Sequence, residues 1–297
     1  MGILDGSWPA LPSHKSWAAE ILLILAGKVP NVETLCFNHV FVVCLSLRDT
    51  SFYNVREFQR FLCAFPRLRD LNLSLVDWRS HLPADAQLGT HADLNAWFKL
   101  LLRSVIFDAG DLVFQPEILL WLISTPSTQT IRHLDTTVSE VGGPSPWGSI
   151  LRALGGSLEH LQLNLSFGKE ITVDQLNLAN SAGLQALNLK SNQDGADTAV
   201  SSDILSVISQ VSCDSCLQEL RLDLRDPQFH SWQEMAALLS RAHFRTLRKI
   251  PIKYLWHDDQ WVQHASWKRS VDDVLSNLFF RGVSVEYSVK RIPPCAV

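Results

Sequence analysis

The chain has 297 residues and carries 26 Lys and Arg against 30 Asp and Glu, which gives a formal net charge of −4. This small acidic charge favours neither nucleic acid nor an acidic membrane surface as a partner. Hydrophobic residues make up 46 % of the chain and charged residues 19 %, a balance that supplies a folded core and excludes a disordered chain.

Leucine dominates the composition, with 46 residues beside 14 Gly and 13 Pro. Such a leucine-rich, turn-poor chain predicts repeated short elements. Strictly apolar stretches such as Ile21–Ala26 are far shorter than the roughly 18 residues that cross a bilayer. The first residues lack the basic start and apolar block of a secretory signal. We therefore expect an intracellular protein, cytoplasmic or nuclear, with no membrane partner.

One pattern, apolar-x-x-apolar-x-apolar, recurs along the chain. It begins at Val32, Leu68, Ile131, Leu158, Leu184, Leu217 and Leu247, with weaker units from Cys44 and Val283 and a candidate strand from Arg103. The alternation of period two predicts short strands whose leucines point into a core. From Ile131 onward the units start about thirty residues apart, a spacing that predicts leucine-rich repeats at the long end of their range.

Helical patterns lie where the chain must return from one strand to the next. They cover His91–Arg103, Ser201–Val211, Ser231–Ala242 and Ser270–Gly282. Ser231 and Glu234 have the spacing of a capping box, and Gly282 suits the left-handed residue that ends a helix.

Strand and helix in alternation predict an α/β fold, an irregular leucine-rich-repeat solenoid. We expect a right-handed arc with a parallel sheet on the concave face and helices on the convex face. The predicted organisation is an N-terminal tail over 1–15, a single solenoid over 16–290 and a C-terminal tail over 291–297. Residues 136–148 concentrate Gly and Pro and are interpreted as a loop or weak hinge.

Signals for chemistry are thin. The six cysteines are scattered, mostly in apolar runs, and we expect them to be reduced. Cys213 and Cys216 form a lone CxxC, which is either half of a metal site or two ordinary thiols in a loop; the second reading is favoured because no further ligand pair lies nearby.

A second candidate for chemistry is the cluster of His257, Asp258, Asp259 and His264. It could serve a metal-dependent hydrolase, and it reads equally well as a solvated helix start. The chain contains no G-x-S-x-G, P-loop or dinucleotide-binding motif. We therefore predict no catalytic residue, no metal and no cofactor, and a protein that is not an enzyme.

The tryptophans fall into two groups. Those in helical patterns are interpreted as core, whereas the C-terminal group either caps the last repeats or forms a binding hot spot. The first group is Trp97, Trp121 and Trp232, and the second is Trp256, Trp261 and Trp267.

The non-leucine positions of the strands point away from the core, so neighbouring strands should place them in a grid on the concave face. We predict that this grid binds a protein partner. Its residues are Asp70, Asn72, His133, Asp135, His160, Gln162, Asn164, Asn188, Lys190, Glu219, Arg221, Asp223, Arg225, Lys249 and Lys253. Arg221, Asp223 and Arg225 are the strongest candidates for contacts, because Arg grips carboxylates bidentately; alternatively, these charges only solvate the face or pair across strands.

The stretch 31–78 resembles the leucine-rich-repeat region of the F-box-like proteins of mushroom-forming fungi. In that family a strand is followed by TSF, a helix ending in FP and the motif LRxLxLxxVxW. Here these are Thr50-Ser51-Phe52, Phe65-Pro66 and Leu68–Trp78. The resemblance covers most of 17–289 and implies a non-catalytic module for protein–protein recognition, which reads the substrate of an F-box-type ubiquitin ligase receptor.

Members of that family usually begin with an F-box, which docks onto the Skp adaptor of a cullin ubiquitin ligase. Leu11-Pro12-Ser13-His14 is the one LP before the first repeat, and it departs from the LPxE-type start. We therefore expect either a natural chain longer than this sequence or a stand-alone scaffold or regulator with no ubiquitin link. A Skp-type adaptor is expected as a partner only where an F-box lies upstream.

Overall fold

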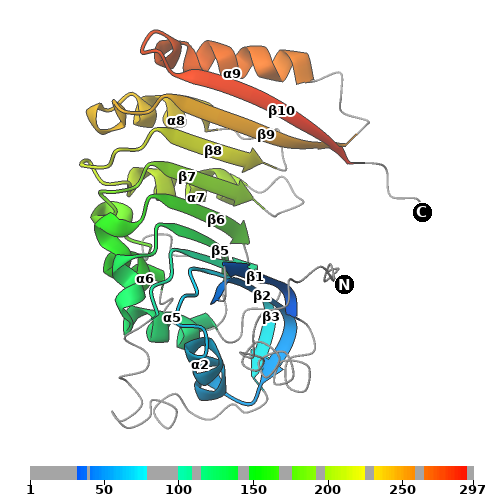
Figure 1. The fold of residues 1–297 in the computed structure, drawn as a ribbon. Helices are drawn as coiled ribbons and strands as arrows, with labels where there is room; N and C mark the ends of the chain where they lie inside the picture. Colours follow the sequence, from blue (N-terminus) through cyan, green and yellow to red (C-terminus); the bar gives the residue numbers. More distant parts are fainter. Residues whose placement is uncertain are drawn as a thin grey trace. The chain divides into compact units, whose positions relative to one another are not determined.

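The computed structural model is an α/β protein in which strands and helices alternate, as the repeat pattern predicts (Figure 1). It describes residues 32–38, 41–78, 100–108, 115–139, 147–166, 176–191, 198–224, 231–257 and 264–292. The chain divides into two compact units, Met1–Thr130 and Ile131–Val297.

The first unit contains the first four strands that the structure describes. Its elements are β1 (Val32–Asn38), β2 (Phe41–Phe52), α2 (Val55–Cys63), β3 (Asp70–Trp78), β4 (Ser104–Asp108), α5 (Gln115–Ile123) and the 3₁₀ turn η2 (Pro126–Gln129). Strands β2, β3 and β4 are parallel, whereas β1 pairs antiparallel with β2. The prediction that every unit adds a parallel strand is therefore wrong for β1. Only residues 39–40 separate β1 from β2, and a parallel crossover needs a dozen or more.

Aromatic side chains fill the core of the first unit. The Phe58 ring lies edge-on to Phe52 at 5.2 Å and to Trp121 at 5.9 Å between centroids, and Phe58 and Trp121 are at most 2 % exposed. The burial of Trp121 confirms its predicted core position. Such edge-to-face pairs contribute roughly 0.5–1.5 kcal/mol beyond the area they bury.

The second unit is a regular succession of strands and returns. Its strands are β5 (His133–Ser139), β6 (His160–Ser166), β7 (Ala186–Ser191), β8 (Glu219–Leu224), β9 (Lys249–His257) and β10 (Ser284–Ile292). Its helices are α6 (Trp147–Leu154), α7 (Thr198–Ser209), α8 (Trp232–Leu239) and α9 (His264–Phe279), and its 3₁₀ turns are η3 (Gly155–Ser157), η5 (Leu178–Asn180) and η6 (Ala242–Phe244).

Each strand of the second unit pairs in parallel with the next in the chain, from β5 to β10. The register aligns the leucines of the repeats: Leu134, Leu161, Leu187 and Leu220 form one line across β5–β8 and are at most 2 % exposed. Burial of each such side chain stabilises the fold by roughly 1.5–3 kcal/mol. The inward direction predicted for the strand leucines is confirmed here.

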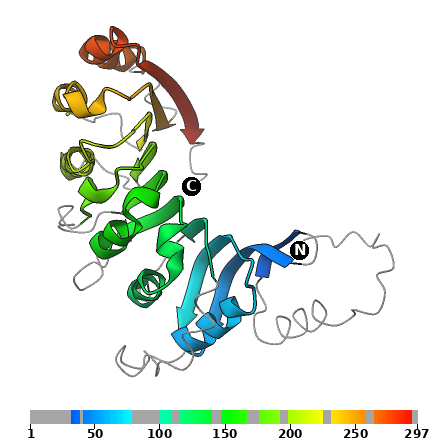
Figure 2. The same cartoon turned by 60° about the vertical axis from the view of Figure 1, so that its left-hand side comes forward.

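Helices α6–α9 cover one face of the β5–β10 sheet (Figures 1 and 2). Each turns an apolar stripe toward the strands, and Leu151, Ile208, Leu239 and Leu275, one from each helix, are all 0 % exposed. The opposite face of this sheet, hereafter the open face, carries no helix among the described residues.

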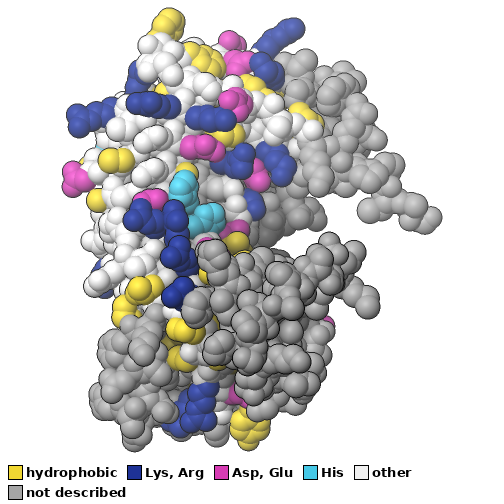
Figure 3. Space-filling model, in the orientation of Figure 1, with side chains coloured by type: hydrophobic (Ala, Val, Ile, Leu, Met, Phe, Trp, Pro, Cys, Tyr) yellow, Lys and Arg dark blue, Asp and Glu magenta, His cyan; other side chains and the backbone are white. Residues whose placement is uncertain are grey.

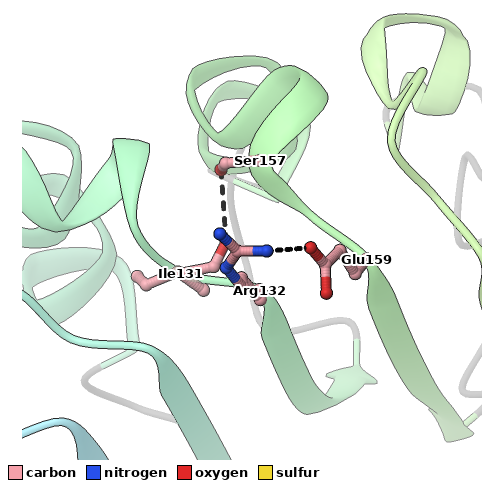
Figure 4. Close-up of polar contacts among 4 residues, drawn as sticks. All are labelled: Ile131, Arg132, Ser157 and Glu159. Atoms are coloured by element: carbon pink, nitrogen blue, oxygen red, sulfur yellow. Dashed lines mark hydrogen bonds and ion pairs between the residues drawn. The ribbon is translucent and has the colours of Figure 1, made fainter.

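A hydroxyl group joins neighbouring repeats at the turn before a strand. Ser157 Oγ donates to the carbonyl of Ile131 at 3.1 Å, and Thr246 Oγ1 donates to that of Leu217 at 2.9 Å. Beside the first of these contacts, the Arg132 guanidinium forms an ion pair with Glu159 (Figure 4). The two hydroxyl contacts satisfy carbonyls that lie at the strand entrances, outside the regular ladder.

Several helix ends differ from the sequence prediction. Ser231 precedes α8 but makes no capping hydrogen bond, because its backbone (φ −97°, ψ 28°) is not the extended one that a cap uses. Within the predicted helix 91–103, residues 100–103 are not helical and lead into β4, while 91–99 lie outside the described residues. Helix α9 begins at His264 rather than Ser270, and Gly282 follows it with φ +79°, as predicted.

The predicted loop or hinge at 136–148 is partly described: β5 runs to Ser139, α6 begins at Trp147, and 140–146 lie outside the described residues. Strand β10 extends to Ile292, so the first two residues of the predicted tail 291–297 belong to the sheet. Residues 1–15 and 293–297 also lie outside the description. Among the helices that are described, none is both long and apolar enough to span a membrane.

Candidate recognition surface

The open face of β5–β10 presents its side chains in three rows, because alternate residues of each strand point the same way and the strands are in register. The first row is His133, His160, Ala186, Glu219 and Lys249; the second is Asp135, Gln162, Asn188 and Arg221; the third is Thr137, Asn164, Lys190, Asp223 and Lys253. In Figure 3, histidine forms one patch of this surface, and basic and acidic side chains are interspersed over β7–β10.

Hydrogen bonds connect the second row from strand to strand. Gln162 Nε2 donates to Asp135 Oδ2, and Asn188 Nδ2 donates to Gln162 Oε1 at 2.6 Å. The side-chain amides of Gln162 and Asn188 therefore both donate toward β5, and their oxygens are the acceptors left for the next strand toward β8. The last oxygen, Asn188 Oδ1, is buried and has no hydrogen-bond partner, and Arg221 is the residue in register with it on β8.

Ion pairs neutralise carboxylates near the C-terminal end of this face. Lys253 Nζ lies 3.6 Å from Asp223 Oδ2, between adjacent strands. Lys249 Nζ lies 2.9 Å from Glu286 Oε2 on β10. Glu286 was not among the predicted residues, although the alternation of VSVEYSV places it on the same face as the row positions of β9.

Lys190 and Arg221 differ from Lys249 and Lys253 in that they form no ion pair among the described residues. Arg221 is exposed and Lys190 is half-buried, and neither has a hydrogen bond or ion pair within the described part of the chain. Lys190 is in register with Asp223, whose carboxylate pairs with Lys253 on its other side. The two cations therefore stand on the open face with their donors available.

Two histidines occupy the first row. The rings of His133 and His160 are stacked, with centroids 6.0 Å apart and an angle of 27° between planes. They lie on adjacent strands in direct register. Among the described residues, no group of three or more His, Cys, Asp or Glu is placed to hold a metal ion, and the two histidines are not part of such a group.

The structure does not gather all predicted surface residues into one described site. Asp70 and Asn72 lie on β3 in the first unit, where both are half-buried and Asn72 Oδ1 has no hydrogen-bond partner. Arg225 lies outside the described residues. The predicted trio of Arg221, Asp223 and Arg225 is thus described only for its first two members, of which Asp223 is already paired.

The candidates for chemistry lie elsewhere. Cys213 and Cys216 are free and exposed in the turn between α7 and β8. Asp258 and Asp259 lie outside the described residues, as do the side chains of His257 and His264.

The C-terminal tryptophans are described only for Trp267, whose ring lies 4.0 Å from Tyr254 and 5.7 Å from Tyr287 between centroids. Trp267 also contacts Trp232, so this α9 residue packs against α8 and the last two strands. That position fits the capping interpretation, in which the group covers the last repeats. Trp97 and Trp261 lie outside the described residues, and Trp256 is described for its backbone alone.

Comparison with known proteins gives no match, either to a family model or to a curated protein. What the open face offers is a set of amide, imidazole, ammonium and guanidinium groups on a rigid sheet. Such groups hold polar and charged groups of a partner through hydrogen bonds and ion pairs.

Proposed function

We propose that this protein is a leucine-rich-repeat module whose open face binds a protein partner, without catalysis. The single observation that carries the proposal is the register of β5–β10, which buries a line of leucines on one face and aligns polar side chains in rows on the other. Because the apolar residues of such a repeat fold are buried in its core, the polar rows are the positions whose side chains can vary to suit a partner.

A protein suits this surface better than a nucleic acid. Charges of both signs alternate on β8–β10, and the formal net charge of the chain is −4. Nucleic-acid surfaces instead carry an excess of Lys and Arg that neutralises phosphates. Mixed charge with amides is typical of protein interfaces, where complementarity fixes the partner and its orientation.

We further propose that the partner is the target of an F-box-type ubiquitin ligase receptor, of which this chain is the substrate-reading repeat region. The resemblance of 31–78 to fungal F-box-like proteins supports this reading. The alternative is a stand-alone scaffold or regulator with no ubiquitin link. A metal-dependent hydrolase built on His257, Asp258, Asp259 and His264 is a weaker third proposal, and metal analysis of the purified protein tests it.

The test is a tagged pull-down from the native cells, scored by mass spectrometry for the Skp adaptor, the cullin and other captured proteins. Ala186→Arg places a long side chain in the first row of the open face, and Ala237→Arg places the same side chain on the exposed surface of α8. We expect Ala186→Arg to lose a set of captured proteins that Ala237→Arg retains.

The outcomes separate the proposals. Recovery of Skp and cullin together with the proteins lost on Ala186→Arg supports the ligase receptor. Recovery of those proteins without Skp and cullin supports the scaffold. If both arginine variants capture the same proteins as the wild type, the open face is not the binding surface, and the proposed function is wrong.

A further inference from the structure

The charge balance of β7–β10 leaves two cations without a carboxylate. On the open face of these strands, Asp223 pairs with Lys253 and Glu286 pairs with Lys249. Glu219 is the remaining carboxylate of the rows on β7–β9, where it is in register with Lys249. Asp135, on β5, accepts from Gln162. Among the described residues, no carboxylate forms an ion pair with Lys190 or Arg221.

The two cations are diagonal neighbours. Lys190 on β7 is in register with Asp223, and Arg221 lies two residues before Asp223 on β8, so it shares the same face. Diagonal positions on adjacent strands are separated by roughly 7–8 Å. Residues i and i+2 of an extended peptide also point to one side and are separated by roughly 6.5–7 Å. An extended segment with acidic residues at i and i+2 thus matches the spacing of the pair.

The chemistry of the pair is also specific. Arg221 can hold one carboxylate bidentately, and Lys190 offers a compact ammonium to the other. A guanidinium has five donors, which is enough for a bidentate carboxylate and for one neighbouring acceptor such as the unpartnered Asn188 Oδ1.

We infer that Lys190 and Arg221 form the site at which the open face receives an acidic, extended segment of a protein partner, with carboxylates two residues apart. The inference rests on the proposed function and adds the chemistry of the partner. A single-stranded nucleic acid fits less well, because the three rows contain no Phe, Tyr or Trp on which bases would stack among the described positions of β5–β9.

The experiment measures fluorescence anisotropy of a labelled peptide of alternating Glu and Ser with the full chain. The same peptide with Gln in place of Glu is the uncharged comparison. Lys190→Glu with Arg221→Glu reverses the site. Arg245→Glu with Arg269→Glu is the matched control, because both arginines are exposed, lie outside the strands and give the same change in net charge.

We expect saturable binding of the Glu peptide, weaker binding of the Gln peptide, and a loss of about tenfold or more in affinity on reversal of the site, since two charge-assisted contacts are removed. The control pair should leave the affinity within about twofold of wild type, because exposed charges away from the site act only through screened long-range fields. Circular dichroism of each variant checks that the strands and helices persist.

The inference fails if the Glu peptide shows no saturable binding, if the control pair weakens it as much as the site pair, or if a labelled single-stranded RNA binds in a way that Lys190 and Arg221 control. These results are distinct from failure of the proposed function. Loss of captured proteins on Ala186→Arg with full capture by the Lys190→Glu, Arg221→Glu variant would uphold the recognition surface and overturn the acidic-segment site.

Discussion

Thr246 Oγ1 donates a hydrogen bond to the carbonyl oxygen of Leu217 at 2.9 Å, across 29 residues of sequence. Ser157 makes the same contact to Ile131, three repeats earlier in the second unit. In both cases the hydroxyl residue directly precedes the first leucine of one repeat, and the acceptor is the first apolar residue of the repeat before it. The hydroxyl thus fixes the spacing between repeats at the turn, where the strand ladder has not yet begun.

Replacing Thr246 with Val is expected to destabilise the protein by about 1–3 kcal/mol, because the shape is kept while the Leu217 carbonyl loses its donor. The measurement is the free energy of unfolding in urea. Ser209→Ala is the control: this hydroxyl is exposed and donates only within its own helix. Equal losses in the two variants would contradict a role for the contact between repeats.

Adjacent residues of β7 should differ sharply in their contribution to stability. Leu187 is 0 % exposed, so Leu187→Ala is expected to cost about 2–5 kcal/mol. Asn188→Ala removes one donor to Gln162 on the open face and should cost only about 1 kcal/mol. Leu161→Ala and Asn164→Ala on β6 give an independent pair. Similar losses within each pair in denaturant melts would show that the assignment of faces is wrong.

The capping interaction that the sequence predicts at Ser231 is found at α2 instead. Asn54 Oδ1 accepts from the Glu57 amide at 3.0 Å, and Glu57 Oε2 accepts from the Tyr53 amide at 2.7 Å. Asn54→Ala should therefore lower the free energy of unfolding by about 1 kcal/mol. Ser231→Ala should change it little, since that hydroxyl makes no capping bond. Thermal melts of the two variants compare them, and a larger loss at Ser231 would contradict the structure.

Alanine substitutions at two glycines of neighbouring turns are expected to differ in their effect on stability. A Cβ at Gly183 would clash with the carbonyl oxygen of Gly156, a backbone atom that cannot move aside cheaply. Gly183→Ala is expected to destabilise the protein by about 1–3 kcal/mol through overpacking between turns. A Cβ at Gly156 would meet nothing within 4 Å, so Gly156→Ala should be tolerated. Urea midpoints of the two variants test this, and equal tolerance would mean that the turns are further apart.

Stability should fall at high pH through Tyr287. Burial raises the pKa of its phenol above the ordinary 10.0, and the Asp272 carboxylate, which accepts from Tyr287 Oη at 2.7 Å, raises it further. Below pH 10 the phenol is protonated in both the folded and the unfolded chain, and its contribution to stability is fully present. Above that pH the unfolded chain releases the proton more readily than the folded one, so stability is lost as pH rises.

The measurement is the free energy of unfolding from neutral pH to about pH 11, which spans the ordinary phenol pKa. Tyr287→Phe removes the ionisable group and should show a shallower decline above pH 10 than the wild type. Tyr53→Phe is the matched control, because Tyr53 is 59 % exposed. Identical pH profiles for wild type and Tyr287→Phe would contradict a raised pKa.

The sequence by itself determined the strands and their faces. In β6–β8 the leucine alternation has a period that only a strand can satisfy with every leucine on one side, so positions such as Leu161 and Gln162 can be assigned to opposite faces from the sequence. The apolar spacing of 201–211 follows the helical period and predicts α7, and the capping-box spacing of Ser231 and Glu234 predicts α8, although the capping bond itself does not form. The antiparallel pairing of β1 with β2 also follows from chain length, since the two residues between these strands cannot make a parallel crossover.

Only the tertiary structure decided which polar groups are already satisfied. Asp223 and Lys253, like Lys249 and Glu286, come from separate repeats, and their pairing depends on the register between strands that sequence spacing does not fix. Likewise, local sequence at Ser231 fits a capping box, but tertiary packing sets the backbone angles on which the bond depends. The availability of Lys190 and Arg221 is a property of these cross-strand contacts. This availability becomes evident only once the ion pairs of the neighbouring charges are known.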